Sequence, residues 1–341
     1  MPTSYVAPAN NGTTGTYDGS TAMGALNYAD EYQKALEQNF PYVLNYGALY
    51  ATPNNNKYRW VNSKTIEIPS IQTTGRVDAD RDTIAFAQRN YSNKWVSKTL
   101  ENQRKWSTLV HPRDIDETNM VATIGNITQV FNEEHKFPEM DAYTISKIYA
   151  DWTSMKNPDT AQTHSADTTV LTTANILSVF DSLMLAMDNG RVPGTGRILY
   201  VTFETLYILK EAEKISRSMD ITSGPNAIDR RVNRLDQVQV VGVPSTLMKT
   251  LYDFSSDYKI DDDAQQINMF LVHPLAVITP VSYTFSRLDA PSAMSEGKYV
   301  YYEESFEDVF VLENKSNAIQ FNVSAGGGTS TSTSTSTSTG Q

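Results

Sequence analysis

Polar and apolar positions alternate through Thr65-Ile66-Glu67-Ile68, just before Pro69. This period of two predicts a β-strand, and Pro69, which cannot donate a ladder hydrogen bond, predicts that the strand has a free edge. The stretch Lys94–Trp106 is also β-prone, with Trp95, Val96 and Leu100. We therefore expect these two segments to form a long hairpin.

The whole region Lys64–Asn119 is β-patterned, polar and only weakly hydrophobic. A stretch of about fifty residues is too long to be an ordinary connection inside a compact domain. Because it has few apolar residues, it would gain little by folding back on its own domain and more by pairing with another molecule. The pattern therefore indicates an arm, and a protein that works by assembling.

A helical period follows. The acidic stretch Asp114-Ile115-Asp116-Glu117 has the spacing of a helix start, and apolar residues then recur at helical intervals: Met120, Ile124, Ile127 and Phe131. A helix over Asn119–Phe137 would be roughly 28 Å long. Pro138 is expected to bend or interrupt it, and the apolar stripe continues with Ile145, Ile148, Trp152 and Met155.

Beyond a polar loop at 157–169, helices and strands follow one another. Thr172 or Thr173 is expected to cap a helix that ends at Asn189-Gly190 and has Ile176, Phe180, Leu183 and Met187 on one face. Thr202 is expected to cap another, running through about Ser216. The expected strands are Arg197–Val201, Val238–Val243, Met269–Val272 and three short ones in Lys298–Val323, around Tyr301, around Phe310 and at Ile319–Val323.

The two ends differ in composition from the rest. Residues 1–22 are rich in Gly, Thr, Asn and Ser and are expected to be an extended or disordered arm, followed by a helix at Ala25–Gln38 and a Tyr-rich irregular stretch at 42–62. From Gly326 a glycine run and a Ser-Thr repeat predict a flexible tail or linker. The expected architecture is α+β.

Charge and composition narrow the function. The 341 residues carry a formal net charge of −11, which repels nucleic acid and anionic membranes and argues against general DNA binding. Cysteine is absent, which excludes disulfides, thiol nucleophiles and cysteine metal sites. We find no signal-peptide pattern at Met1-Pro2-Thr3-Ser4 and no apolar run long enough to span a membrane.

The search for catalytic or metal chemistry leaves no convincing site. The four histidines are His111, His135, His164 and His273. They are far apart in sequence and lack the i, i+4 zinc pattern, and His273 is interpreted as a structural residue at a strand end. The glycines at Pro193-Gly194-Thr195-Gly196 predict a turn, because no phosphate-binding motif is present. Asp261-Asp262-Asp263 lacks the spacing of a calcium loop. We predict no catalytic, cofactor-binding or metal residues.

The candidate functional residues are instead those of a subunit interface. Asp78 and Asp80 alternate, as does Asp82, with arginines close by, and this pattern favours ion pairing between subunits over metal binding. Large aromatic residues in the arm add contact area. The predicted interface residues are Arg76, Asp78, Asp80, Arg81, Trp95 and Trp106.

The order of the parts resembles the major capsid proteins of tailed bacteriophages, with the Hong Kong 97-type coat fold. Four segments carry the resemblance: Lys64–Ile71 with Thr74-Gly75 and Asp80-Arg81; Asp114–Asn119 with Pro138–Tyr143; Val238–Pro244 with Phe270–Val277; and Asp308–Leu312 with Lys315–Ile319. The resemblance covers about residues 25–323. The Ser-Thr tail has no counterpart in it.

The resemblance implies an organisation and a function. It implies an N-terminal arm at 1–59, an extended loop at 60–112, a spine helix with part of the peripheral domain at 113–173, an axial domain at 174–281, peripheral strands at 282–323 and a tail at 324–341. Copies would form hexamers and pentamers of an icosahedral shell around double-stranded DNA, with portal, scaffold or decoration proteins as partners. The protein would be made in the bacterial cytoplasm and reside in the virion.

Two other classes remain open from the sequence. A second assembly protein is possible, such as a tail tube or an encapsulin-like compartment that has the same fold and holds no DNA. A soluble hydrolase using His273 or the acidic loops would be a monomer or a small oligomer. Assembly state separates the hydrolase from the others, and enclosed DNA separates a capsid from a compartment.

Overall fold

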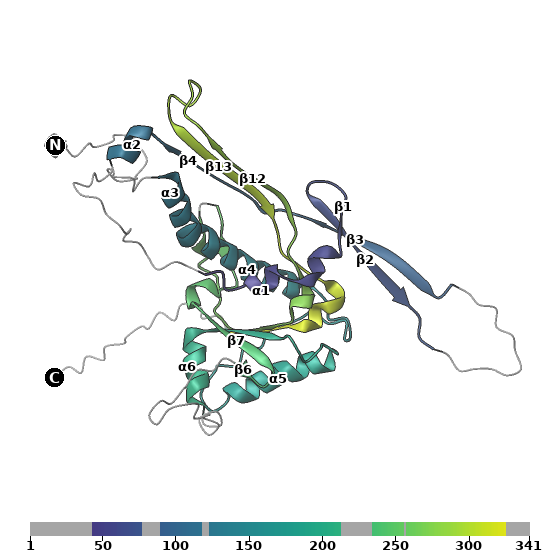
Figure 1. The fold of residues 1–341 in the computed structure, drawn as a ribbon. Coiled ribbons are helices and arrows are strands. Elements are labelled where there is room, and N and C mark those ends of the chain that lie inside the picture. The colour runs from purple at the N-terminus through teal and green to yellow at the C-terminus, as the bar shows by residue number, and fades with distance from the viewer. Residues whose placement is uncertain (1–42, 77–88, 118–122, 213–233, 256, 325–341) are drawn as a thin grey trace, which may run out of the picture. The chain divides into compact units, whose positions relative to one another are not determined.

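A computed structural model describes residues 43–76, 89–117, 123–212, 234–255 and 257–324 (Figure 1). The chain divides into two compact units. The first holds Asn102–Phe137 and Ser282–Phe306; the second holds Leu44–Glu101, Pro138–Val281 and the segment after Glu307. Residues 1–42 of the expected N-terminal arm, with its predicted helix, lie outside the described residues, as does the expected tail apart from Ser324.

The core of the second unit is a five-stranded sheet of order β15-β10-β5-β7-β6. Its strands are β15 (Ile319–Val323), β10 (Ile267–Val272), β5 (Ile198–Thr202), β7 (Val238–Val243) and β6 (Arg234–Leu235). Only β5 and β7 are parallel, joined by a connection that includes α6 (Phe203–Glu211). All five residues of β5 are buried, as expected of a strand covered on both faces.

Alternate residues of this sheet serve two different cores. One face packs Leu199, Val201, Met269 and Leu271 against α5 (Ile176–Asn189). On the other face, Phe270 stacks on Phe321 with ring centroids 4.6 Å apart, and Phe321 lies 5.2 Å from Trp152 of α4 (Phe137–Ser154). The period-two alternation of side chains therefore explains how one short sheet is buried on both sides.

The predicted long helix is built from several pieces. The acidic start belongs to a separate short helix, α2 (Pro112–Glu117), and α3 (Ile124–Phe131) begins at its own cap, where the Thr123 hydroxyl accepts from the Asn126 amide at 3.3 Å. The prediction that a single helix starts at Asn119 is therefore wrong, because the described helix starts at Ile124. Residues 118–122 are not described.

Pro138 does not end the helix. A π-helical turn, η2 (Asn132–Lys136), precedes α4, and the Phe137 amide donates to the carbonyl of Asn132, five residues back. Proline lacks an N–H and its ring crowds the carbonyl four residues earlier, so a widened turn is a physical solution at this point. The predicted interruption thus takes the form of a local change in helical pattern. Ile145, Ile148 and Trp152 are buried, as their spacing predicts.

The helices and strands of the second half agree closely with expectation, with differences at their ends. Gly190 is the C-cap of α5, but the N-cap is Asn175 and not Thr172 or Thr173. Thr202 caps α6 by accepting from the Thr205 amide at 3.2 Å, and the described helix ends at Glu211, before the predicted Ser216.

Smaller elements complete the second unit. They are α1 (Gly47–Tyr50), η1 (Pro53–Asn56), η3 (Ser245–Leu247), β8 (Tyr252–Asp253), β9 (Lys259–Ile260), η4 (Pro274–Ala276), β11 (Val277–Ile278), β14 (Phe310–Val311) and η5 (Glu313–Ala318).

A buried carboxylate ties the start of α1 to α4: Asp141 accepts from the Asn45 amide at 2.8 Å and from the Tyr46 amide at 3.1 Å.

The first unit contains a sheet of order β12-β13-β4, formed by β12 (Val281–Asp289), β13 (Tyr299–Glu307) and β4 (Gln103–Val110). β13 and β4 pair antiparallel over eight residue pairs. Of the three short strands expected in Lys298–Val323, β13 is therefore longer than expected, and β13, β14 and β15 lie in three different sheets. Strand β12 was not expected from the sequence.

Candidate subunit interface

A three-stranded sheet forms the arm of the second unit. It contains β1 (Arg59–Trp60), β2 (Thr65–Thr73) and β3 (Tyr91–Thr99), and Figure 1 shows β2 and β3 side by side as a ribbon. Their antiparallel register runs from Thr65↔Thr99 to Thr73↔Tyr91, which confirms the predicted hairpin. We call β2 and β3 together the hairpin. It ends at Thr99, and Trp106 lies on β4 of the other unit, so a second strand running through Trp106 is wrong.

The position of Pro69 explains how the ladder tolerates it. The Thr74 amide donates to the Asn90 carbonyl and the Leu100 amide to the Lys64 carbonyl, which shows which alternate pairs along the hairpin exchange hydrogen bonds. Pro69 then falls at a pair that exchanges no hydrogen bonds, so its nitrogen points away from β3. β1 reaches only as far as the partner of Glu67, so no strand of the described part of the chain lies opposite that nitrogen. The predicted free edge is confirmed.

The hairpin is anchored at its base and exposed towards its tip. Ile66 is fully buried, whereas Gln72 and Thr73 at the far end of β2 are exposed. Near the base, Arg59 pairs with Glu67 at 2.7 Å and its guanidinium lies 3.9 Å from the ring centroid of Trp95. These contacts join β1, β2 and β3 on one face.

That same face, the outer face, carries an exposed apolar stripe. Since β-strand residues alternate, Pro69, Ile71, Tyr91 and Trp95 all point to the side of Glu67. Ile71 is 71% exposed, Tyr91 57% and Trp95 41%. Large apolar side chains gathered on one exposed face are typical of an interaction surface.

The predicted interface residues fall in different places. Trp95 lies in the outer face, and Arg76 is exposed just beyond β2. Asp78, Asp80 and Arg81 lie outside the described residues. Trp106 packs within the first unit, stacked on Phe131 with centroids 4.0 Å apart and near Tyr301 at 5.8 Å. Arg59, Ile71 and Tyr91 were not among the predicted residues: the strand register brings Arg59 and Ile71 to the face of Trp95, and Tyr91 shares that face because it lies four residues before Trp95 on β3.

Two of the four histidines, His273 and His164, have structural partners. His273 Nδ1 accepts from the Leu275 amide at 3.2 Å, and Nε2 lies 3.1 Å from the Thr195 carbonyl oxygen. Burial lowers the pKa of His273, which favours a neutral ring that donates to that carbonyl. His164 lies 2.9 Å from the Ser316 hydroxyl and stacks on Trp152. The interpretation of His273 as a structural residue is confirmed.

The other candidate sites are turns. The Asp263 amide donates to the Asp261 carboxylate at 3.0 Å, an ordinary Asx turn, and Gly196 has φ +84° in the turn before β5. Within the described residues, no three His, Asp or Glu side chains are grouped so as to hold a metal ion. Nor is any helix in that part of the chain long and apolar enough to cross a membrane.

No protein-family model and no curated protein matches the sequence, but solved structures do. The mature capsid of bacteriophage PhiM1 is similar with a TM-score of 0.63 at 13% identity, over 88% of this chain and 92% of that chain. The capsid of the cyanophage P-SCSP1u gives a TM-score of 0.60 at 11% identity, over 88% and 93%. The chain has a phage capsid fold.

A third structure agrees, from Mycobacterium phage Che8, with a TM-score of 0.58 at 12% identity over 86% of this chain and 96% of that chain. At such identities the similarity establishes the fold. The phage capsid fold confirms the α+β class expected from the sequence, and the Hong Kong 97 subtype stays a prediction.

Proposed function

We propose that this chain is the major capsid protein of a tailed bacteriophage. It assembles into hexamers and pentamers of an icosahedral shell that encloses the double-stranded DNA genome. One observation carries the proposal: the similarity to solved phage capsid chains extends over 86–88% of this chain and 92–96% of those chains. Most of the chain therefore has a counterpart in these capsid structures.

The hairpin supplies a physical reason for assembly. Its outer face leaves Ile71, Tyr91 and Trp95 in water, and the far end of β2 from Ile71 to Thr73 is exposed. Covering those side chains with a neighbouring copy would bury apolar area and pair a free strand edge. Each contact can be weak, because a closed shell multiplies it over many copies.

The charge is consistent with enclosing DNA without binding it tightly. A net charge of −11 disfavours strong attraction between the shell and the packaged genome. The proposed partners are other copies of the chain, a portal, and scaffold or decoration proteins. The proposed location is the virion, after synthesis in the bacterial cytoplasm.

Substitutions in the outer face test the proposal. Ile71→Asp places a charge where a neighbour is expected to pack, and since Ile71 is 71% exposed the subunit should still fold. We expect no particles by light scattering at concentrations where the wild type assembles. Ile71→Met keeps the apolar contact and serves as the matched control. Particles formed equally by all three proteins would contradict this use of the hairpin.

A further inference from the structure

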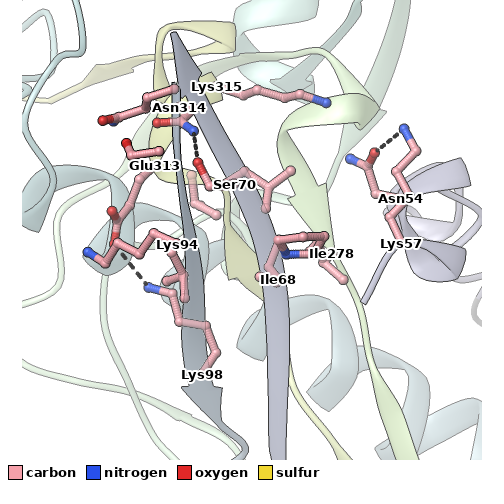
Figure 2. A pocket seen from close by; sticks show the side chains of 16 residues that line it. Asn54, Lys57, Ile68, Ser70, Lys94, Lys98, Ile278, Glu313, Asn314 and Lys315 are labelled. Carbon is pink, nitrogen blue, oxygen red and sulfur yellow. Dashed lines mark hydrogen bonds and ion pairs between the residues drawn. The ribbon is translucent and has the colours of Figure 1, made fainter. Parts of the chain in front are cut away.

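A cavity of about 520 Å³ lies beneath the inner face of the hairpin, opposite the outer face (Figure 2). Its walls come from the hairpin, η1, β11, β14 and η5, all in the second unit. Its apolar lining includes Ile68 and Val96 of the hairpin, Ile278 of β11 and Val311 of β14. The cavity therefore has apolar walls and joins segments that are far apart in the sequence.

The charged groups of the cavity are mostly cationic. Four lysines line it, Lys57, Lys94, Lys98 and Lys315, against one carboxylate, Glu313, so the lining carries a net charge of about +3. Lys98 is paired with Glu313 at 3.8 Å. This cationic cavity stands out in a chain whose net charge is −11.

Lys57 and Lys315 form a like-charge pair. Figure 2 shows Lys315 reaching towards the side of the cavity where Lys57 stands. Burial and the charge of Lys57 both lower the pKa of Lys315, which agrees with this proximity. Neither ammonium forms an ion pair with a carboxylate of the described residues. Among the described residues, these two cations are therefore held together without a neutralising carboxylate.

Lys57 is held in place by a buried amide. Asn54 is fully buried, and its Nδ2 donates to the Leu275 carbonyl at 2.6 Å and the Val277 carbonyl at 3.3 Å. These bonds fix the orientation of the amide, so that Oδ1 accepts from Lys57 Nζ at 3.2 Å. An ammonium has three donors, so Lys57 keeps donors for a ligand while its position is set.

A like-charge pair beside apolar walls is a local inconsistency in an isolated subunit, and an anionic ligand would resolve it. An aspartate or glutamate side chain fits both features, since its carboxylate would lie between the ammonium groups and its methylenes against Ile68, Ile278 and Val311. The chain itself is the nearest source of such groups, with 39 acidic residues against 28 basic ones.

We propose that the cavity is a carboxylate-binding site that receives an acidic side chain from a second copy of this chain. The inference rests on the proposed function, because it requires self-assembly. It deepens that function by assigning the inner face of the hairpin an electrostatic contact, separate from the apolar contact of the outer face.

Zero-length crosslinking with a carbodiimide tests the site directly, because it joins an amine to a carboxylate only when the two are in contact. Assembled particles made from a mixture of ¹⁴N- and ¹⁵N-labelled subunits would be crosslinked, digested and analysed by mass spectrometry. We expect mixed-label peptides joining Lys57 or Lys315 to an Asp or Glu. The Lys98–Glu313 pair, within one chain, is an internal positive control.

A double variant, Lys57→Met with Lys315→Met, gives a second readout. It removes both charges and the repulsion between them, so the thermal midpoint of the unassembled subunit should stay unchanged or rise. The concentration needed for half-assembly should rise about five- to tenfold, the effect of one lost ion pair per contact. Lys259→Met, an exposed lysine on β9 outside the cavity, is the matched control and should assemble as the wild type does.

The outcomes separate the two proposals. Wild-type protein that forms no particles overturns the proposed function and this inference with it. Particles without any crosslink from Lys57 or Lys315, and a double variant that assembles as the wild type does, overturn the inference alone. If inorganic phosphate shifts the NMR signals of the cavity in the unassembled wild type but not in the double variant, and no crosslink forms, the ligand is a free oxyanion and the second-copy assignment is wrong.

Discussion

Arg197 holds together the turn between α5 and β5, and its removal should destabilise the second unit. Its side chain is 0% exposed. The guanidinium donates to the Pro193 carbonyl at 2.9 Å, to the Val192 carbonyl at 2.7 Å and to the Asp188 carboxylate at 2.5 Å. Through these three hydrogen bonds, Arg197, which directly precedes β5, is joined to the end of α5 and to the turn between them.

The size of the effect follows from these contacts. Two hydrogen bonds from a charged donor to carbonyls and one charge-assisted bond to a carboxylate are lost in Arg197→Met. The cost is moderated because the Asp188 side chain is 59% exposed and can be solvated again. We expect a loss of about 3 kcal/mol in the free energy of unfolding.

Urea unfolding of the unassembled subunit, followed by far-UV circular dichroism, measures this loss. A change of that size should lower the midpoint by about 1 M. Arg287→Met is the control, because the Arg287–Asp289 pair is exposed, at 67% and 57%, and should contribute less than about 1 kcal/mol. If the two variants unfold within about 1 kcal/mol of each other, Arg197 does not organise this turn, because an exposed ion pair contributes no more than that.

Three further predictions concern other parts of the second unit. Pro69→Ala should change stability by less than about 0.5 kcal/mol, since no strand of the described residues faces the Pro69 nitrogen. Ser70→Pro lies one residue on, at a hydrogen-bonded pair, and should cost more than about 1 kcal/mol. Equal urea midpoints for the two variants would contradict the register. Gly242→Val should cost about 1–3 kcal/mol, because a Cβ there would approach the Phe203 ring to 2.9 Å, and an unchanged thermal midpoint would contradict that contact. Burial lowers the pKa of His164, so the stability that the neutral ring contributes is present above its ordinary pKa of about 6.5 and is lost as the pH falls below it. Thermal midpoints measured from pH 7.5 to 5 should therefore fall less in His164→Gln than in the wild type. Parallel curves would contradict a buried, neutral His164.

The sequence predicts best the elements whose residues are buried on regular faces. The helix α5 and the strand β7 match their expected positions closely, because Phe180 and Met187 or Val238 and Val243 define one period without ambiguity. The hairpin was also expected from alternation, and its free edge from Pro69, but its register is known only from the structure. By contrast, the break between β3 and β4 falls at 100–102, where no Gly or Pro marks it and the polar alternation continues on both sides.

The functional surfaces depend on tertiary structure to a greater extent. Trp95 is recognisable from the sequence as an exposed aromatic in a polar segment. Ile71 joins it only through the pairing of β2 with β3, whereas Tyr91 lies on the same face because it is four residues away on β3. The cavity could not be predicted, because Lys57 and Lys315 are brought together by two short 3₁₀ helices far apart in the chain.

Electron microscopy of the purified recombinant protein, after size-exclusion chromatography, tests the central claim most directly. The account predicts closed shells or capsomer rings, and nuclease-protected double-stranded DNA inside shells produced in phage infection. Shells that enclose protein cargo without DNA would instead indicate an encapsulin-like compartment. A monomer that stays monomeric at high concentration and in crowding salts would contradict the claim that this chain works by assembling.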